Sequence, residues 1–154
     1  MGKTCCFLGH RTVNETEDIK TKLVVLIEKL IVEENVDTFL FGSKSRFDSL
    51  CLEIVTKLKE KHPHINRVYV RAEYPCISEC YENYLLETYE YTYYPERITK
   101  AGRAVYVERN YEMIDHSQFC IVYFDQQMAP TTRKSGTIIA LDYAIQKRKN
   151  IIRV

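Results

Sequence analysis

Short apolar runs alternate along this chain with longer segments in which apolar residues recur at helical spacing. The runs occur at residues 5–8, 38–42, 68–70, 119–124 and 151–154. A short apolar run bounded by turn residues is typical of a buried strand, and a period of about 3.6 residues is typical of an amphipathic helix. Regular alternation of the two predicts an α/β fold with a central, mainly parallel five-stranded sheet between two layers of helices.

The predicted helices have recognisable starts. Asn14 is followed by Glu17 and Ser45 by Asp48, in each case at the spacing of a capping box. These pairs predict helices that begin near Asn14 and near Ser45, and apolar periodicity predicts a third helix over about 136–148.

The middle of the chain, residues 74–116, departs from this rhythm. It contains nine of the twelve tyrosines. So long an excursion between two strands is typical of a lid, a binding wall or an oligomer contact, and tyrosine supplies large contact area with one polar tip. An individual tyrosine ring can equally do no more than cover the sheet. For the segment as a whole we favour an interface, and hence a homo-oligomer formed through this tyrosine-rich insertion.

Length and charge restrict the class of protein. A chain of 154 residues predicts a single domain over 1–154 that buries its own core. The 22 basic and 21 acidic side chains leave a formal charge of +1, which disfavours nucleic acid and anionic membranes as partners. The N-terminal sequence lacks the pattern of a signal peptide, and no apolar stretch approaches the roughly 20 residues that span a bilayer. We therefore expect a cytoplasmic protein.

Cysteine usage agrees with that location. Cys5, Cys6 and Cys120 lie in apolar runs and Cys51 lies on an apolar helix face, where a reduced thiol acts as a small hydrophobe. The other two form a C-x-x-x-C pair at residues 76–80, a weaker spacing than that of paired zinc knuckles. We predict six reduced thiols, no metal site and no cofactor.

Three small-residue turns suggest where a ligand binds. Gly9-His10-Arg11 follows the first strand, Gly42-Ser43 follows the second, and Ser135-Gly136-Thr137 opens a helix. Open α/β sheets bind ligands at the carboxyl ends of their strands, and the free amides and dipole of a helix start suit a phosphate. Ordinary turns and a serine cap would also account for the second and third sequences. A loop that only turns, however, has no need of His10 and Arg11.

Three carboxylates stand near predicted strand ends and are candidates for acid–base chemistry: Asp48, Glu73 and Asp125. Two carboxylates beside a bound sugar support cleavage of a glycosidic bond. Asp48 can equally be no more than the partner of the Ser45 cap. The sequences G-x-G-x-x-G after the first strand, G-x-x-x-x-G-K-[ST] and G-x-S-x-G are absent, which disfavours common dinucleotide enzymes, P-loop NTPases and α/β-hydrolases.

Four short motifs follow one another along the chain. They are Cys5-Cys6-Phe7-Leu8-Gly9-His10-Arg11, Phe41-Gly42-Ser43 to Phe47-Asp48, Arg109-Asn110 with Met113-Ile114-Asp115, and Ser135-Gly136-Thr137 with Tyr143-Ala144. In this order and spacing the chain resembles the YpsA-like branch of the SLOG superfamily. The resemblance implies a Rossmann-like fold that binds a nucleotide or nucleotide-derived ligand at the carboxyl edge of its sheet.

The same resemblance bears on catalysis. Related LOG-type phosphoribohydrolases cleave the N-glycosidic bond of nucleoside monophosphates with a P-G-G-x-G-T-x-x-E motif. Gly136 and Thr137 of that motif remain here, while Ala140 stands in the place of the glutamate. An alanine side chain can neither take a proton nor stabilise an oxocarbenium ion. We therefore expect a binding or sensor protein, the alternative being a hydrolase that relies on Glu73 or Asp48.

Related DprA-type proteins suggest single-stranded nucleic acid as a further ligand, which the near-neutral charge disfavours. The residues predicted to bind a nucleotide-like small molecule are Gly9, His10, Arg11, Gly42, Ser43, Asp48, Arg109, Ser135, Gly136 and Thr137.

Overall fold

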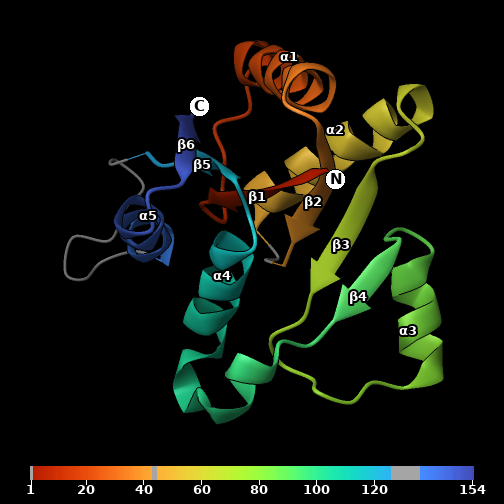
Figure 1. Cartoon of the computed structure of the whole chain (residues 1–154), viewed down its shortest axis with the longest axis vertical. Coiled ribbons are helices and arrows are strands. Elements are labelled where there is room, and N and C mark those ends of the chain that lie inside the picture. Colours follow the sequence, from red (N-terminus) through yellow and green to blue (C-terminus); the bar gives the residue numbers. More distant parts are fainter. Residues whose placement is uncertain (1, 43–44, 126–135) are drawn as a thin grey trace.

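A computed structural model describes residues 2–42, 45–125 and 136–154. Its strands form one sheet in the order β4-β3-β2-β1-β5-β6, and all neighbouring pairs are parallel (Figure 1). The strands are β1 (Lys3–Gly9), β2 (Val36–Phe41), β3 (Asn66–Val70), β4 (Tyr91–Tyr93), β5 (Phe119–Tyr123) and β6 (Asn150–Arg153). The prediction of an α/β fold with a parallel sheet is confirmed, but the predicted count of five strands is wrong.

The additional strand, β4, lies inside the tyrosine-rich segment. It is three residues long and pairs with β3, Thr92 lying opposite Tyr69. Its residues are tyrosine and threonine and are exposed or half-buried, so no apolar run reveals it. Its tyrosine and threonine residues do have high strand propensity. Part of the tyrosine-rich segment therefore belongs to the regular alternation of strands and helices, as α3 (Glu79–Leu86) and β4.

Helices cover both faces of the sheet (Figure 1). They are α1 (Glu17–Glu33), α2 (Arg46–Lys61), α3 (Glu79–Leu86), α4 (Val105–Asp115) and α5 (Gly136–Gln146), with 3-10 turns η1 (Glu96–Lys100) and η2 (Gly102–Ala104) before α4. Within the described ranges, none of the helices has both the length and the apolar character needed to cross a membrane.

The two predicted helix caps differ in outcome. Ser45 caps α2 as predicted, its hydroxyl oxygen accepting a hydrogen bond from the backbone N–H of Asp48 at 3.1 Å. The cap of α1 is Thr16, which accepts from the N–H of Ile19. Asn14 lies before the helix, and its backbone N–H donates instead to the hydroxyl of Tyr123. The prediction of Asn14 as a cap is therefore wrong by two residues.

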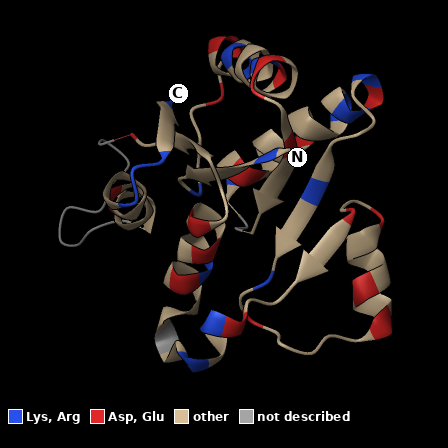
Figure 2. Cartoon of the chain, viewed as in Figure 1, with Lys and Arg blue, Asp and Glu red and all other residues tan. Residues whose placement is uncertain are grey.

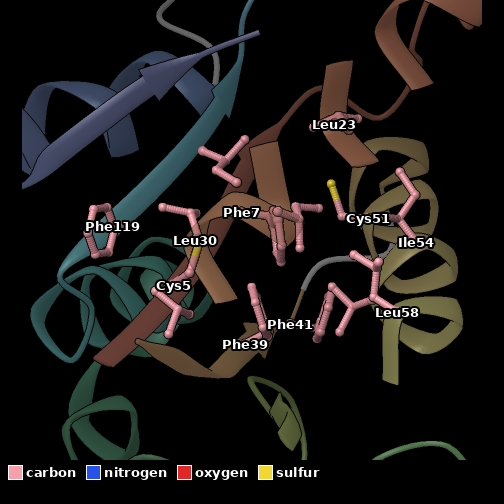
Figure 3. Close-up of a cluster of buried hydrophobic side chains, with 14 of the residues drawn as sticks. Cys5, Phe7, Leu23, Leu30, Phe39, Phe41, Cys51, Ile54, Leu58 and Phe119 are labelled. Carbon is pink, nitrogen blue, oxygen red and sulfur yellow. The ribbon is translucent and has the colours of Figure 1, made fainter. Parts of the chain in front are cut away.

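Alternate residues of the central strands face opposite helix layers. On β1, Cys5 and Phe7 pack in a core with α1 and α2, while Cys6 and Leu8 pack in a second core with α4 and α5. Figure 3 shows aromatic side chains of β1 and β2 facing Cys51, Ile54 and Leu58 of α2. The burial of all four cysteines predicted to be core residues is confirmed, whereas the remaining pair, at residues 76 and 80, is exposed.

Candidate functional site

The strand order places a topological switch point between β1 and β5. The chain runs from β1 through β2 and β3 to β4 on one side, whereas β5 and β6 lie on the other. Ligands of open α/β sheets bind in the crevice at such a point. His10 spans it, because its Nε2 accepts a hydrogen bond from the backbone N–H of Asp125 at 2.9 Å. The ring is buried beside Tyr123 and Phe124, so in this structure His10 ties the two loops together.

Gly9 and Arg11 join this edge to the start of α2. A Cβ atom on Gly9 would lie 2.3 Å from the ring of Phe47, so only glycine allows α2 to approach β1 this closely. The backbone carbonyl of Arg11 accepts a hydrogen bond from the N–H of Arg46 at 2.7 Å, and the Arg11 side chain is exposed. Gly9 therefore serves packing, while Arg11 leaves a cation at the edge.

Arg109 of α4 reaches the end of the neighbouring strand β2. Its side chain is only 6% exposed, and its Nη1 donates a hydrogen bond to the carbonyl of Gly42 at 2.5 Å. A Cβ atom on Gly42 would lie 2.8 Å from Cδ of Arg109 and 3.0 Å from the sulfur of Met113. The absence of a side chain at Gly42 is thus what makes room for the arginine.

Asp48 lies in the first turn of α2, on the other side of the Gly42 backbone. Its carboxyl group is 4% exposed and accepts a backbone hydrogen bond from Gly42, but within the described ranges its Oδ1 has no partner. Burial raises the pKa of Asp48 to about 8, against the lowering effect of Arg109 and of the Gly42 hydrogen bond. Burial also lowers the pKa of Arg109, whose Nε likewise has no partner among the described residues. A buried carboxyl group and a buried guanidinium therefore contact the same glycine, and each has one polar atom without a partner in the described part of the chain.

Glu73 approaches Arg109 through a tyrosine. The hydroxyl of Tyr106 donates a hydrogen bond to the Glu73 carboxylate, and the Tyr106 ring centre lies 5.4 Å from Cζ of Arg109. That distance is typical of a cation–π contact. Both Glu73 and Tyr106 are exposed, so the two candidate carboxyl groups differ: Asp48 is on the interior side of Arg109 and Glu73 on the solvent side.

Two further aromatic residues complete the cluster. Tyr69, at the end of β3, contacts Tyr89 with 5.2 Å between ring centres, and burial together with the charge of Asp48 raises the pKa of both hydroxyl groups. Sequence reasoning misses these residues and Tyr106 as site residues. The position of Tyr69 at a strand end could have identified it, whereas Tyr89 and Tyr106 have no distinguishing mark among the tyrosines of their segment.

The start of α5 forms a separate part of the edge. Gly136 is exposed, with open space where a Cβ atom would lie, and Thr137 is buried. Because α5 joins the end of β5 to the start of β6, its N-terminus points to the carboxyl edge of the sheet. Ala140 is 1% exposed and belongs to the core formed with α4. A carboxylate at this position would be buried in apolar surroundings.

The structure thus brings four predicted site residues into one cluster: Gly42, Asp48, Glu73 and Arg109. Gly9, His10 and Arg11 at the carboxyl end of β1 lie on another part of the same edge, and so do Gly136 and Thr137 at the start of α5. Ser43 and Ser135 lie outside the described residues. In the described ranges, no three His, Cys, Asp or Glu side chains are grouped so that they could hold a metal ion.

Comparison with known proteins finds similarity to an uncharacterized protein. No family model matches the sequence. The chain is 28% identical over 142 residues to an uncharacterized SPbeta prophage-derived protein, YoqJ, of Bacillus subtilis (strain 168). The match covers 82% of this chain and 80% of that protein. The similarity therefore extends over most of both sequences.

Proposed function

We propose that this chain is a YpsA-like member of the SLOG superfamily that binds a nucleotide or nucleotide-derived ligand without cleaving it. The observation that carries the proposal is the buried guanidinium of Arg109, with its unsatisfied Nε, at the carboxyl edge of a parallel sheet. Guanidinium groups and helix starts are the commonest protein partners of phosphate. The burial of four unpaired thiols supports a cytoplasmic location for this activity.

Aromatic rings beside the arginine supply a surface for the base. Tyr106 is exposed over Arg109, and Tyr69 is partly exposed at the end of β3. Stacking of a base on tyrosine contributes about 1–3 kcal/mol and tolerates any base. The cluster therefore offers a charged group for the phosphate and rings for the base on the same part of the edge.

The position of Ala140 argues against hydrolysis. The motif that catalyses the reaction in LOG-type enzymes has a glutamate here, and the alanine of this chain is packed in the core. The competing function, cleavage of a nucleoside monophosphate, has one observation in its favour. Asp48, with a pKa of about 8, is a carboxylic acid still protonated at neutral pH, and Glu73 is a second carboxyl group near the same arginine. In the structure, however, Asp48 lies on the interior side of Arg109, so a substrate held on the solvent side of the guanidinium would not contact it.

Calorimetric titration with nucleoside monophosphates tests the binding proposal. Gly136→Asp places a negative side chain in open space at the start of α5, where it repels a phosphate, so we expect binding to be abolished. Gln146→Glu is a matched control, because it adds the same charge at the other end of the same helix. Equal affinities of the Gly136 variant and the unmodified chain would place the ligand away from α5.

Chromatographic detection of free base separates the two functions. The unmodified chain is expected to bind nucleoside monophosphates and release almost no base. Release at an ordinary enzymatic rate, on the order of one per second, would support the hydrolase if it disappeared in Asp48→Asn or Glu73→Gln.

For the tyrosine-rich segment we propose an oligomer contact. Tyr74, Tyr84 and Tyr91 are each more than half exposed. Residues 72–96 contain six glutamates and no lysine or arginine, and Figure 2 shows acidic but no basic positions on α3. Two such faces repel one another, so self-association through them should strengthen with salt. Sedimentation of Tyr84→Ser and Tyr91→Ser variants in low and high salt tests this contact, and unchanged association would exclude it.

A further inference from the structure

The guanidinium of Arg109 and the carboxyl group of Asp48 both contact the backbone of Gly42 at the end of β2, and each has a buried polar atom without a hydrogen-bond partner in the described ranges. Arg109 donates to the Gly42 carbonyl, and Asp48 accepts from the Gly42 backbone. Nε of Arg109 and Oδ1 of Asp48 are both buried without partners in the described part of the chain. We propose that an oxyanion binds beside Arg109 and that its binding is coupled to uptake of one proton by Asp48. The inference rests on the proposed function, in which a nucleotide phosphate supplies the oxyanion.

The coupling follows from the charge of the cluster. With Asp48 ionised, the negative carboxylate offsets Arg109, and an approaching anion meets a site with little net charge. With Asp48 protonated, the negative charge that remains near the arginine is that of Glu73, which is exposed and therefore better screened by water than the buried Asp48. An anion therefore prefers the protonated form. By linkage the bound anion must raise the proton affinity of Asp48 by the same factor.

Among Asp48 and the titratable groups that face it, Asp48 is the group whose charge changes near neutral pH. Arg109 of α4 faces it, as do Cys51 of α2, Tyr69 of β3 and Tyr89 beyond α3. Burial raises the pKa of the thiol and of both phenols, so all three stay neutral below pH 9. The pKa of Asp48 itself, about 8, lies within the range where binding can be measured.

Arg109 also has neighbours on its solvent side, Tyr106 and Glu73. The hydrogen bond between them keeps the Glu73 carboxylate on the phenol rather than on the guanidinium. Nε of Arg109 is buried and has no partner among the described residues, so an oxyanion that reached it past Tyr106 and Glu73 would gain a charged donor. Charge-assisted hydrogen bonds of this kind are the stronger ones in proteins.

Sulfate is a suitable probe, since its charge stays at −2 throughout the pH range of interest, and AMP is the nucleotide probe. Both are titrated into the full chain by calorimetry at pH 7, 8 and 9, at constant ionic strength. Each titration is repeated in two buffers of different ionisation enthalpy, which gives the number of protons taken up. If only the protonated form binds, affinity falls about tenfold from pH 7 to pH 9, and uptake rises from almost none to nearly one proton per anion.

Asp48→Asn keeps an oxygen for the Gly42 hydrogen bond and cannot titrate. We expect this variant to bind sulfate with the same affinity at pH 7 and pH 9 and with no proton uptake. Asp18→Asn, on the exposed first turn of α1, is the matched control and should behave like the unmodified chain. The proton count on the unmodified chain needs no variant, so the inference stays testable if Asp48→Asn does not fold.

Each outcome bears on one proposal or on both. AMP binding without proton uptake at any pH would overturn the coupling and leave the nucleotide function standing. Sulfate binding with uptake but no AMP binding would support the coupling and overturn the nucleotide function. If neither anion binds, both proposals are overturned. If proton uptake persists unchanged in Asp48→Asn, the assignment of the proton to Asp48 is overturned.

Discussion

Replacement of Asp48 by asparagine is expected to change how the free energy of unfolding depends on pH. The pKa of this carboxyl group is about 8 in the folded chain against an ordinary value of 3.8, because the group is buried. Between these values the folded chain keeps a proton that the unfolded chain releases. The contribution of this proton to the free energy of unfolding has its full value below about pH 4. It decreases by about 1.4 kcal/mol per pH unit above that and is lost as the pH rises through 8.

From pH 5 to pH 7 the unmodified chain should therefore lose about 3 kcal/mol relative to Asp48→Asn. This is a large part of the 5–15 kcal/mol that stabilises a typical domain. Urea denaturation followed by circular dichroism at pH 5, 6, 7 and 8 measures the difference between the two proteins, in which the effects of the other carboxylates cancel. Asp18→Asn serves as the control. Parallel pH profiles of the unmodified chain and Asp48→Asn would refute the assignment of a raised pKa to Asp48.

Three further outcomes are expected. Gly42→Ala should lower the free energy of unfolding by about 1–3 kcal/mol, since its Cβ would lie 2.8 Å from Cδ of Arg109. Urea denaturation measures this loss. A value below about 0.5 kcal/mol, the size of an ordinary surface change, would contradict the packing described. Ala140→Glu should lower the free energy of unfolding by about 3 kcal/mol or more, because it buries a carboxylate, and the variant should release no base. A variant that is both stable and active would show that α5 shifts to accommodate the glutamate. Thiol titration should find six reactive groups in denaturant and two, Cys76 and Cys80, in the folded chain, with no zinc; loss of thiols in pairs would indicate disulfides.

The central strands are predictable from sequence because both of their faces are buried. Residues 5–8 and 119–124 read as continuous apolar runs for this reason, as expected for interior parallel strands. The three residues of β4 are tyrosine and threonine and form no such run, so this strand is recognised only through its pairing with β3. Helix caps are local and hence predictable to within a few residues, as Ser45 and Thr16 show.

The candidate site is less predictable because its contacts join distant parts of the chain. Asp48 can be identified from sequence as a member of the α2 cap, but its burial beside Arg109 depends on how α4 packs across the end of β2. The same packing brings Tyr106 over the arginine. Ala140 is visible in the sequence as a departure from the LOG motif, whereas its burial against α4 follows only from the fold.

The most direct test of nucleotide binding at this edge is calorimetric titration of the unmodified chain and Arg109→Met with the four common nucleoside monophosphates. Lys29→Met, which removes an exposed cation from α1, is the matched control. We expect at least one nucleotide to bind to the unmodified chain and to the control with one-to-one stoichiometry. Arg109→Met should weaken this binding at least tenfold, about 1.4 kcal/mol. Failure of all four nucleotides to bind, or equal affinity in Arg109→Met, would contradict this expectation.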